Sequence, residues 1–180
     1  LTRHLQVLED PQGSLDIDAV RAAIGLEPVP AGGANFGFSP SVWWARFVVH
    51  NPRNEPVDLL LRQDYPLIDH LELWLPDGTG GLRHVRTGDR QPFASRDIAL
   101  RNFVFALTVP AGQTVPVYLR YATGGSMDIG LQLFTPVPLL ERVGTEQLAY
   151  GVYYGGFIAL IVYNFIIFLA VRDRVFFWYL

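Results

Sequence analysis

Cysteine is absent from the 180 residues, which excludes disulfide bonds, thiolate catalysis and cysteine zinc sites. Other catalytic patterns are missing too. There is no glycine-rich phosphate loop and no Gly-x-Ser-x-Gly elbow, and the four histidines lack zinc-binding spacing. Asp69 and Glu72 are three apart on an expected strand and point to opposite faces, so they do not form a glycosidase pair. We therefore expect a non-enzymatic chain with no cofactor and no metal.

Charge is scarce in the C-terminal part of the chain. Of 17 acidic residues and 14 arginines, only Asp173, Arg172 and Arg174 follow Glu146. The front part therefore carries a mild excess of acid, which argues against a protein that tracks nucleic-acid phosphates. The chain divides into a polar front part and an apolar rear part.

The rear part contains an uncharged run, Leu148 to Val171. At about 1.5 Å per residue this run reaches about 36 Å, more than the ~30 Å hydrocarbon core of a bilayer. A buried helix of a soluble protein is the alternative, but such helices usually have about 10 to 14 residues. We predict that residues 148–171 form a transmembrane helix.

The charges that follow this run orient the helix. Arg172 and Arg174 favour the cytoplasmic side, which leaves residues 1–147 outside the cytoplasm. We expect a folded domain over residues 1–138 and a juxtamembrane linker over 139–147. Residues 172–180 are expected to be a loop and the start of a second, truncated membrane helix of a longer protein.

The front part changes from one short helical pattern to period-two alternation. Ser14 or Asp16 precedes apolar residues at helical spacing from Ile17 to Ile24, and residues 28–40 are rich in Pro and Gly, as in a loop. Residues 42–49 then alternate, with Trp43, Ala45, Phe47 and Val49 on one face and Trp44, Arg46, Val48 and His50 on the other. Several further short strands follow. The pattern predicts a mostly β, antiparallel sandwich with a short N-terminal helix.

A series of short motifs carries a family resemblance. In chain order they are Leu8-Glu-Asp-Pro, Gly37-Phe, Trp44-Ala-Arg46, Asn51-Pro, Tyr65-Pro-Leu-Ile-Asp69, Thr87-Gly-Asp, Pro92-Phe93, Arg96, Tyr118-Leu-Arg120, Tyr150-Gly-Val-Tyr-Tyr-Gly155, Tyr163-Asn164 and Arg172-Asp-Arg174. This succession resembles the second extracellular domain and first membrane helix of bacterial seven-transmembrane receptors with diverse intracellular signalling modules.

The resemblance implies a jelly-roll domain similar to carbohydrate-binding, galactose-binding-like modules. It would lie in the periplasm, at residues 1–147, and be anchored in the bacterial inner membrane. It also implies a membrane bundle and a cytoplasmic output domain, a histidine kinase or a diguanylate cyclase that makes cyclic di-GMP.

Six residues are candidates for contact with a sugar-like ligand, which needs aromatic faces and groups that fix hydroxyls. They are Trp44, Arg46, Asp69, Trp74, Arg96 and Arg101. A structural role is the alternative for each one, because strand aromatics often belong to the core and an arginine beside them often stacks or pairs. Asp69 shares a face with Leu71, so we expect a buried ion pair with Arg96 or Arg46.

Two functions from different classes follow. The first is a periplasmic sensor that binds a small, carbohydrate-like ligand and biases a two-state membrane receptor. The second is an interaction module that forms a homodimer or binds another receptor. A membrane-anchored glycosidase is the least favoured alternative.

Overall fold

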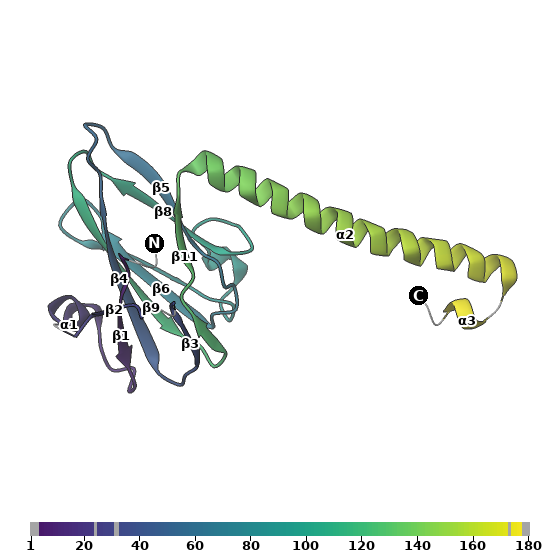
Figure 1. Cartoon of the computed structure of the whole chain (residues 1–180), viewed down its shortest axis with the longest axis horizontal. Coiled ribbons are helices and arrows are strands. Elements are labelled where there is room, and N and C mark those ends of the chain that lie inside the picture. The colour runs from purple at the N-terminus through teal and green to yellow at the C-terminus, as the bar shows by residue number, and fades with distance from the viewer. Residues whose placement is uncertain (1–3, 24, 31–32, 173, 178–180) are drawn as a thin grey trace. The chain divides into compact units, whose positions relative to one another are not determined.

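The alternating segments of the front part form antiparallel strands in the computed structural model (Figure 1). The structure describes residues 4–23, 25–30, 33–172 and 174–177. It divides into two units, Leu1–Pro136 and Val137–Leu180, which we describe separately as the β domain and the helical unit.

The largest sheet of the β domain has six strands, in the order β2-β1-β4-β9-β6-β7. Every neighbouring pair in it is antiparallel. The strands are β1 (Gln6–Asp10), β2 (Glu27–Pro28), β4 (Val42–His50), β6 (His70–Pro76), β7 (Leu82–Thr87) and β9 (Thr114–Ala122).

Two smaller sheets and a 3-10 turn complete the β domain. One sheet has the order β11-β5-β8, and the other pairs β10 with β3. Their bounds are β3 (Asn35–Phe38), β5 (Val57–Gln63), β8 (Phe103–Val109), β10 (Ser126–Asp128) and β11 (Leu131–Phe134), and the 3-10 turn η2 spans Phe93–Ser95.

One hydrophobic core joins the inner faces of the six-stranded and three-stranded sheets. It includes Ala45, Phe47, Leu73 and Leu119 from the first sheet and Leu61, Phe105 and Leu107 from the second, each no more than 2% exposed. In β4, β6 and β9 every second residue faces this core, as the alternation in the sequence predicts. The prediction of a mostly β, antiparallel fold is confirmed, whereas the jelly-roll connectivity stays a prediction.

A short helix, α1 (Ile17–Ala22), covers part of the outer face of the six-stranded sheet. The Asp16 side chain caps it by accepting a hydrogen bond from the backbone N–H of Ala19 at 2.8 Å. Val20 is fully buried against Trp44, Trp74 and Tyr118. The expected N-terminal helix is confirmed, and Asp16 rather than Ser14 is its cap.

Residues 28–40 differ from the prediction of a plain loop. Glu27–Pro28 forms β2 against β1, and Asn35–Phe38 forms β3 against β10. Their partners lie elsewhere in the sequence, so pairing overrides the local turn chemistry of the glycines and prolines.

The helical unit consists mainly of α2, which runs from Pro136 to Val171. Proline at the start of a helix is favourable because its missing N–H would have no partner there. Within the described residues, α2 alone is long and apolar enough to cross a membrane, and its apolar stretch is not buried. The C-terminal apolar helix is confirmed. It ends at Val171 and includes residues 139–147, which we expect to link the domain to the membrane span.

A turn follows α2. Arg172 adopts a positive φ of 57°, and α3 (Arg174–Phe177) begins two residues later. The expected second membrane helix extends to residues 178–180, which lie outside the described residues.

Candidate functional site

Three neighbouring strands place charged side chains together on the outer face of the six-stranded sheet. The strand registers set Glu72 of β6 opposite Arg86 of β7 on one side and opposite Arg120 of β9 on the other. Leu71 and Leu73 point into the core, so the pleat turns Glu72 outward. Directly opposite residues are near neighbours, and the three charges therefore meet.

The Glu72 carboxylate has three partners. Its Oε1 lies 3.1 Å from Nη1 of Arg120, and its Oε2 lies 3.3 Å from Nε of Arg86. The Nε2 of His84 lies 2.8 Å from the same Oε2. The Glu72 side chain is only 12% exposed, whereas that of Arg86 is 74% exposed. One largely buried carboxylate thus faces two guanidinium groups, which leaves a local surplus of positive charge.

A hollow of about 210 Å³ lies beside this group, and we call it the Glu72 hollow. It is lined by His70, Glu72, Arg86, Thr87, Gln91 and Arg120. Each of these side chains can donate or accept a hydrogen bond. The hollow is smaller than the ~300 to 1,000 Å³ typical of sites for drug-sized ligands, so it suits one small polar molecule or one sugar ring.

An aromatic cluster lies on the same face under α1. The rings of Trp44 and Trp74 stack with centroids 5.1 Å apart, and those of Trp74 and His84 stack at 4.4 Å. In the sheet, β7 lies on one side of β6, and β4 lies on the other side beyond β9, so Trp74 has a ring on each of its faces and is 9% exposed. Trp74 therefore supports His84 and does not offer a free face to a ligand.

A second hollow, of about 440 Å³, adjoins His84 at the edge of α1. It is lined by Ile17, Asp18, Arg21, Trp74, Pro76, Gly80, Gly81, Leu82 and His84. The His84 side chain, 37% exposed, belongs to this second hollow and also contacts Glu72. His84 therefore lies between the two hollows on the face formed by β6 and β7.

The family model for the 7TMR-DISM extracellular 2 domain matches residues 2–135. The chain belongs to the 7TMR-DISM extracellular 2 family. The resemblance seen in the motifs is confirmed. The β domain is a 7TMR-DISM extracellular 2 domain, and among the described residues that follow it α2 is able to cross a membrane.

Solved structures give more distant similarities for this 7TMR-DISM domain. TmCBM61, solved in complex with beta-1,4-galactotriose, has 11% identity and a TM-score of 0.35, covering 73% of this chain and 88% of its own. BtGH115A is a family GH115 4-O-methyl-alpha-glucuronidase with specificity for decorated arabinogalactans. It has 11% identity and a TM-score of 0.25, and the match covers 57% of this chain and 14% of BtGH115A. No curated protein matches the chain.

Two of the predicted site residues, Trp44 and Arg46, do lie on the outer face. Trp44 is 1% exposed under α1, and among the described residues its buried Nε1–H has no hydrogen-bond acceptor. Arg46 donates from Nη1 to Oε1 of Gln6 at 3.2 Å and lies over the Tyr118 ring at 5.8 Å. The burial of Trp44 disagrees with direct stacking on a ligand, so its role in this structure is packing.

Asp69 is ion-paired, but with a different arginine from those predicted. Its carboxylate lies 3.1 Å from Nε of Arg90 and accepts a hydrogen bond from the Gly124 backbone N–H at 2.8 Å. The Gly124 N–H and then the positive charge of Arg90 lower the pKa of Asp69 from its ordinary value. The prediction of Arg96 or Arg46 as partner is wrong, because the Gly88–Gln91 turn after β7 brings Arg90 to Asp69.

Arg96 holds the segment between β7 and β8 in place. Its guanidinium lies 4.9 Å from the Phe93 ring centroid and 4.6 Å from that of Phe103. It also donates to the carbonyl of Leu100 at 2.6 Å and to the carbonyl of Arg101. Burial lowers the pKa of the Arg96 guanidinium. The Arg101 side chain is exposed.

None of the six predicted residues is among the described residues that line the Glu72 hollow, although Trp74 lines the second one. Sequence reasoning missed Glu72, His84, Arg86 and Arg120 as a group. Alternation does place Glu72 on the face opposite Leu71. The missing information was the register that sets Arg86 and Arg120 across from it.

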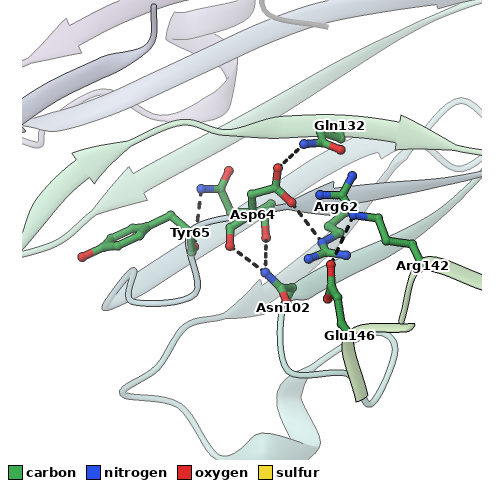
Figure 2. Close-up of polar contacts among 8 residues, drawn as sticks. Arg62, Asp64, Tyr65, Asn102, Gln132, Arg142 and Glu146 are labelled. Carbon is green, nitrogen blue, oxygen red and sulfur yellow. Dashed lines mark hydrogen bonds and ion pairs between the residues drawn. The ribbon is translucent and has the colours of Figure 1, made fainter. Parts of the chain in front are cut away.

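A separate polar cluster lies around Asp64, beyond the end of β5 (Figure 2). The Asp64 carboxylate lies 3.0 Å from Nε of Arg62 and accepts a hydrogen bond from the Gln132 amide. Asn102 donates to the backbone carbonyl of Asp64 at 2.6 Å. These contacts join β5, β11 and the start of β8, and we interpret the cluster as structural.

Metal-ligating groups do not gather in the part of the chain that the structure describes. No set of three or more His, Asp or Glu side chains there is arranged to hold a metal ion.

Proposed function

We propose that the β domain is the periplasmic ligand-sensing input of a multi-pass receptor in the bacterial inner membrane. In this proposal it binds a small, carbohydrate-like polar ligand in the Glu72 hollow. Binding would control a cytoplasmic output such as a diguanylate cyclase or a histidine kinase. The observation that carries the proposal is the hollow itself, where charged and neutral polar side chains converge at the outer face of a sheet.

The surroundings of the hollow support this function. His70 and Gln91 provide neutral donors and acceptors for hydroxyl groups, while Glu72 and its arginines provide charged ones. The site lies on strands of the larger sheet, and rigid elements hold binding groups more precisely than loops do. A ligand would shift the receptor only by binding one of its states more tightly than the other.

The family and α2 support the connection to a membrane. The chain belongs to a family of extracellular domains, and a single residue, Thr135, separates the end of β11 from the start of α2. A helix that continues from the last strand can carry a change in the domain toward the bilayer without a flexible loop. Arg172, directly after α2, favours the cytoplasmic side for that end of the helix.

Thermal unfolding of the full chain in detergent micelles tests ligand binding. We expect one or more members of a panel of sugars and small polar metabolites to raise the melting temperature saturably. A ligand at about 100 times its Kd stabilises by roughly 2.7 kcal/mol. Replacing Arg120 by alanine should abolish the shift, whereas Arg53→Ala, on an exposed loop residue, should leave it intact.

An interaction module is the second candidate, favoured by one observation. Phe38 on β3 is 86% exposed, which is unusual for a large apolar side chain on a strand. If no panel member stabilises the chain and the β domain instead associates in a concentration-dependent way that Phe38→Ser abolishes, the homodimer function replaces ligand sensing.

A further inference from the structure

We infer that the Glu72 hollow takes a ligand bearing a carboxylate, and that this group binds Arg86 and Arg120. The inference rests on the proposed ligand-sensing function and names the class of ligand. Acidic sugars and small organic acids share this chemistry.

The first argument is the charge balance of the hollow. Among the described residues, Arg86 and Arg120 form ion pairs with Glu72 and with no other acid. One negative charge is therefore shared between two positive ones, even when His84 is neutral. A neutral ligand leaves this surplus uncompensated, whereas one carboxylate balances it.

The second argument is the number of guanidinium N–H donors that Glu72 does not engage. A guanidinium group has five N–H donors, and Glu72 engages one nitrogen of each arginine, Nε of Arg86 and Nη1 of Arg120. The Arg86 side chain is 74% exposed and that of Arg120 is 23% exposed, so donors remain on the solvent side. Guanidinium donors match a carboxylate in two parallel hydrogen bonds, and such charge-assisted bonds are stronger than neutral ones.

The third argument concerns Glu72 itself. Its carboxylate occupies the arginines in the same way that a ligand carboxylate would. Glu72 therefore orients the two side chains and also competes with the ligand for them. If these ion pairs had only a structural role, removing the Glu72 charge would not raise the affinity for an acid.

The size and lining of the hollow restrict the range of possible ligands further. About 210 Å³ admits one small molecule and not a long chain. His70 and Gln91 lie around the arginines and can bind hydroxyl groups of the same molecule. A single acidic sugar ring satisfies both the charged and the neutral groups, and a short hydroxylated acid is the smaller alternative.

Calorimetry on the full chain in detergent micelles tests the inference with matched ligands. Galacturonate and galactose differ only in a carboxylate that replaces a hydroxymethyl group, as do glucuronate and glucose, and tartrate represents an acid without a ring. We expect at least one acid to bind saturably, and its neutral counterpart to bind at least about tenfold more weakly. Affinity for the acid should fall as the salt concentration rises. Tighter binding of a uronate than of tartrate identifies the acidic sugar, and the reverse identifies the small acid.

Variants separate binding from folding. Arg86→Ala and Arg120→Ala should each weaken acid binding at least about tenfold. Arg53→Ala removes the same charge from an exposed loop and should not change it. If Arg120→Ala lowers expression, Arg86→Ala still tests the inference, because Arg86 is exposed and its replacement should leave the fold intact. Glu72→Gln should raise the affinity for the acid, because the competing charge is gone.

Three outcomes would overturn the inference. Neutral sugars that bind as tightly as their acids would refute it while leaving ligand sensing intact. Acid binding that is unchanged in Arg86→Ala and Arg120→Ala would place the carboxylate elsewhere. Failure of all these ligands, combined with the Phe38-dependent association described above, would refute the proposed function as well.

Discussion

At the scale of single residues, Asp69 and Asp128 are identical side chains whose surroundings shift their pKa values in opposite directions. The Gly124 N–H and then Arg90 lower the pKa of Asp69. Burial, and then the negative charge of Asp64, raise the pKa of Asp128. The two carboxylates therefore contribute to the pH dependence of stability with opposite signs.

Replacing Asp128 by asparagine should reduce the loss of folding stability that the natural chain undergoes as the pH rises toward neutral. The native state holds the Asp128 proton more tightly than the unfolded state, whose pKa is near the ordinary 3.8. Its contribution is therefore favourable at low pH and declines as pH rises from that value through the raised native pKa. Thermal unfolding of the full chain between pH 4 and pH 7, followed by tryptophan fluorescence, should show Asp128→Asn improving relative to the natural chain as pH rises. A constant difference would contradict this sign.

Asp69→Asn is the matched comparison. At pH 7 it should lower the free energy of unfolding by about 1 kcal/mol, because a charge-assisted hydrogen bond to Gly124 and the Arg90 pair are lost. The lowered pKa means that this stabilisation is present above 3.8 and is lost as pH falls through the native value. The same titration should therefore show the penalty shrinking below about pH 4. A penalty that persists there would show that packing, and not charge, explains it.

At the scale of elements, α1 depends on its contacts with the sheet. Six residues are too few for a stable isolated helix. The cap by Asp16 satisfies one orphan N–H, and Val20 inserts into the aromatic cluster of Trp44, Trp74 and Tyr118. The helix in turn covers the aromatic cluster beside the two hollows, so its packing shapes that face.

Truncating the buried side chain of α1 should destabilise the β domain. Val20→Ala removes two methyl groups from a fully buried position and should cost about 2 kcal/mol. Asp16→Ala should cost about 1 kcal/mol through the lost cap. Arg21→Ala, an exposed change on the same helix, should stay within about 0.5 kcal/mol. Thermal or denaturant unfolding checks the order, and equal effects of Val20→Ala and Arg21→Ala would show that α1 does not depend on this packing.

At the scale of the whole molecule, the β domain carries most of the charged residues, whereas α2 exposes mainly apolar side chains. At about 1.5 Å per residue, the 36 residues of α2 extend about 54 Å, well beyond a ~30 Å hydrocarbon core. The predicted span covers only residues 148–171, so the first turns of α2, which carry Glu141, Arg142 and Glu146, are left for water or headgroups. In that part, Nε of Arg142 bonds Oε1 of Glu146 at 3.2 Å, as i,i+4 pairs on an exposed helix do.

The absence of cysteine allows a direct test of membrane topology. Gln113→Cys, in the exposed turn between β8 and β9, should react with a membrane-impermeant maleimide in intact spheroplasts. Val171→Cys keeps both following arginines and should react only after permeabilisation, because we expect that end to face the cytoplasm. The reverse pattern would contradict the orientation, and recovery of the chain in the soluble fraction would contradict the membrane assignment.

Composition and periodicity alone determine several features of this protein. An uncharged run as long as Leu148 to Val171 indicates a long apolar helix that is able to cross a membrane, because its backbone bonds internally and its side chains avoid water. Alternation in residues 42–49 settles which residues turn inward, since successive strand residues point to opposite faces. Motif order also identifies the family. All of these signals are local in the chain.

Only the tertiary structure decided the candidate site. Glu72, Arg86 and Arg120 lie far enough apart in sequence that their meeting depends on the registers of β6 with β7 and β9. A shift of one residue in either register would separate them, and no local pattern encodes the register across long loops. The same applies to the pairing of Asp69 with Arg90 and to the rings that cover both faces of Trp74. Side-chain chemistry can be read from the sequence, but contacts between distant strands follow from the packing of the whole domain.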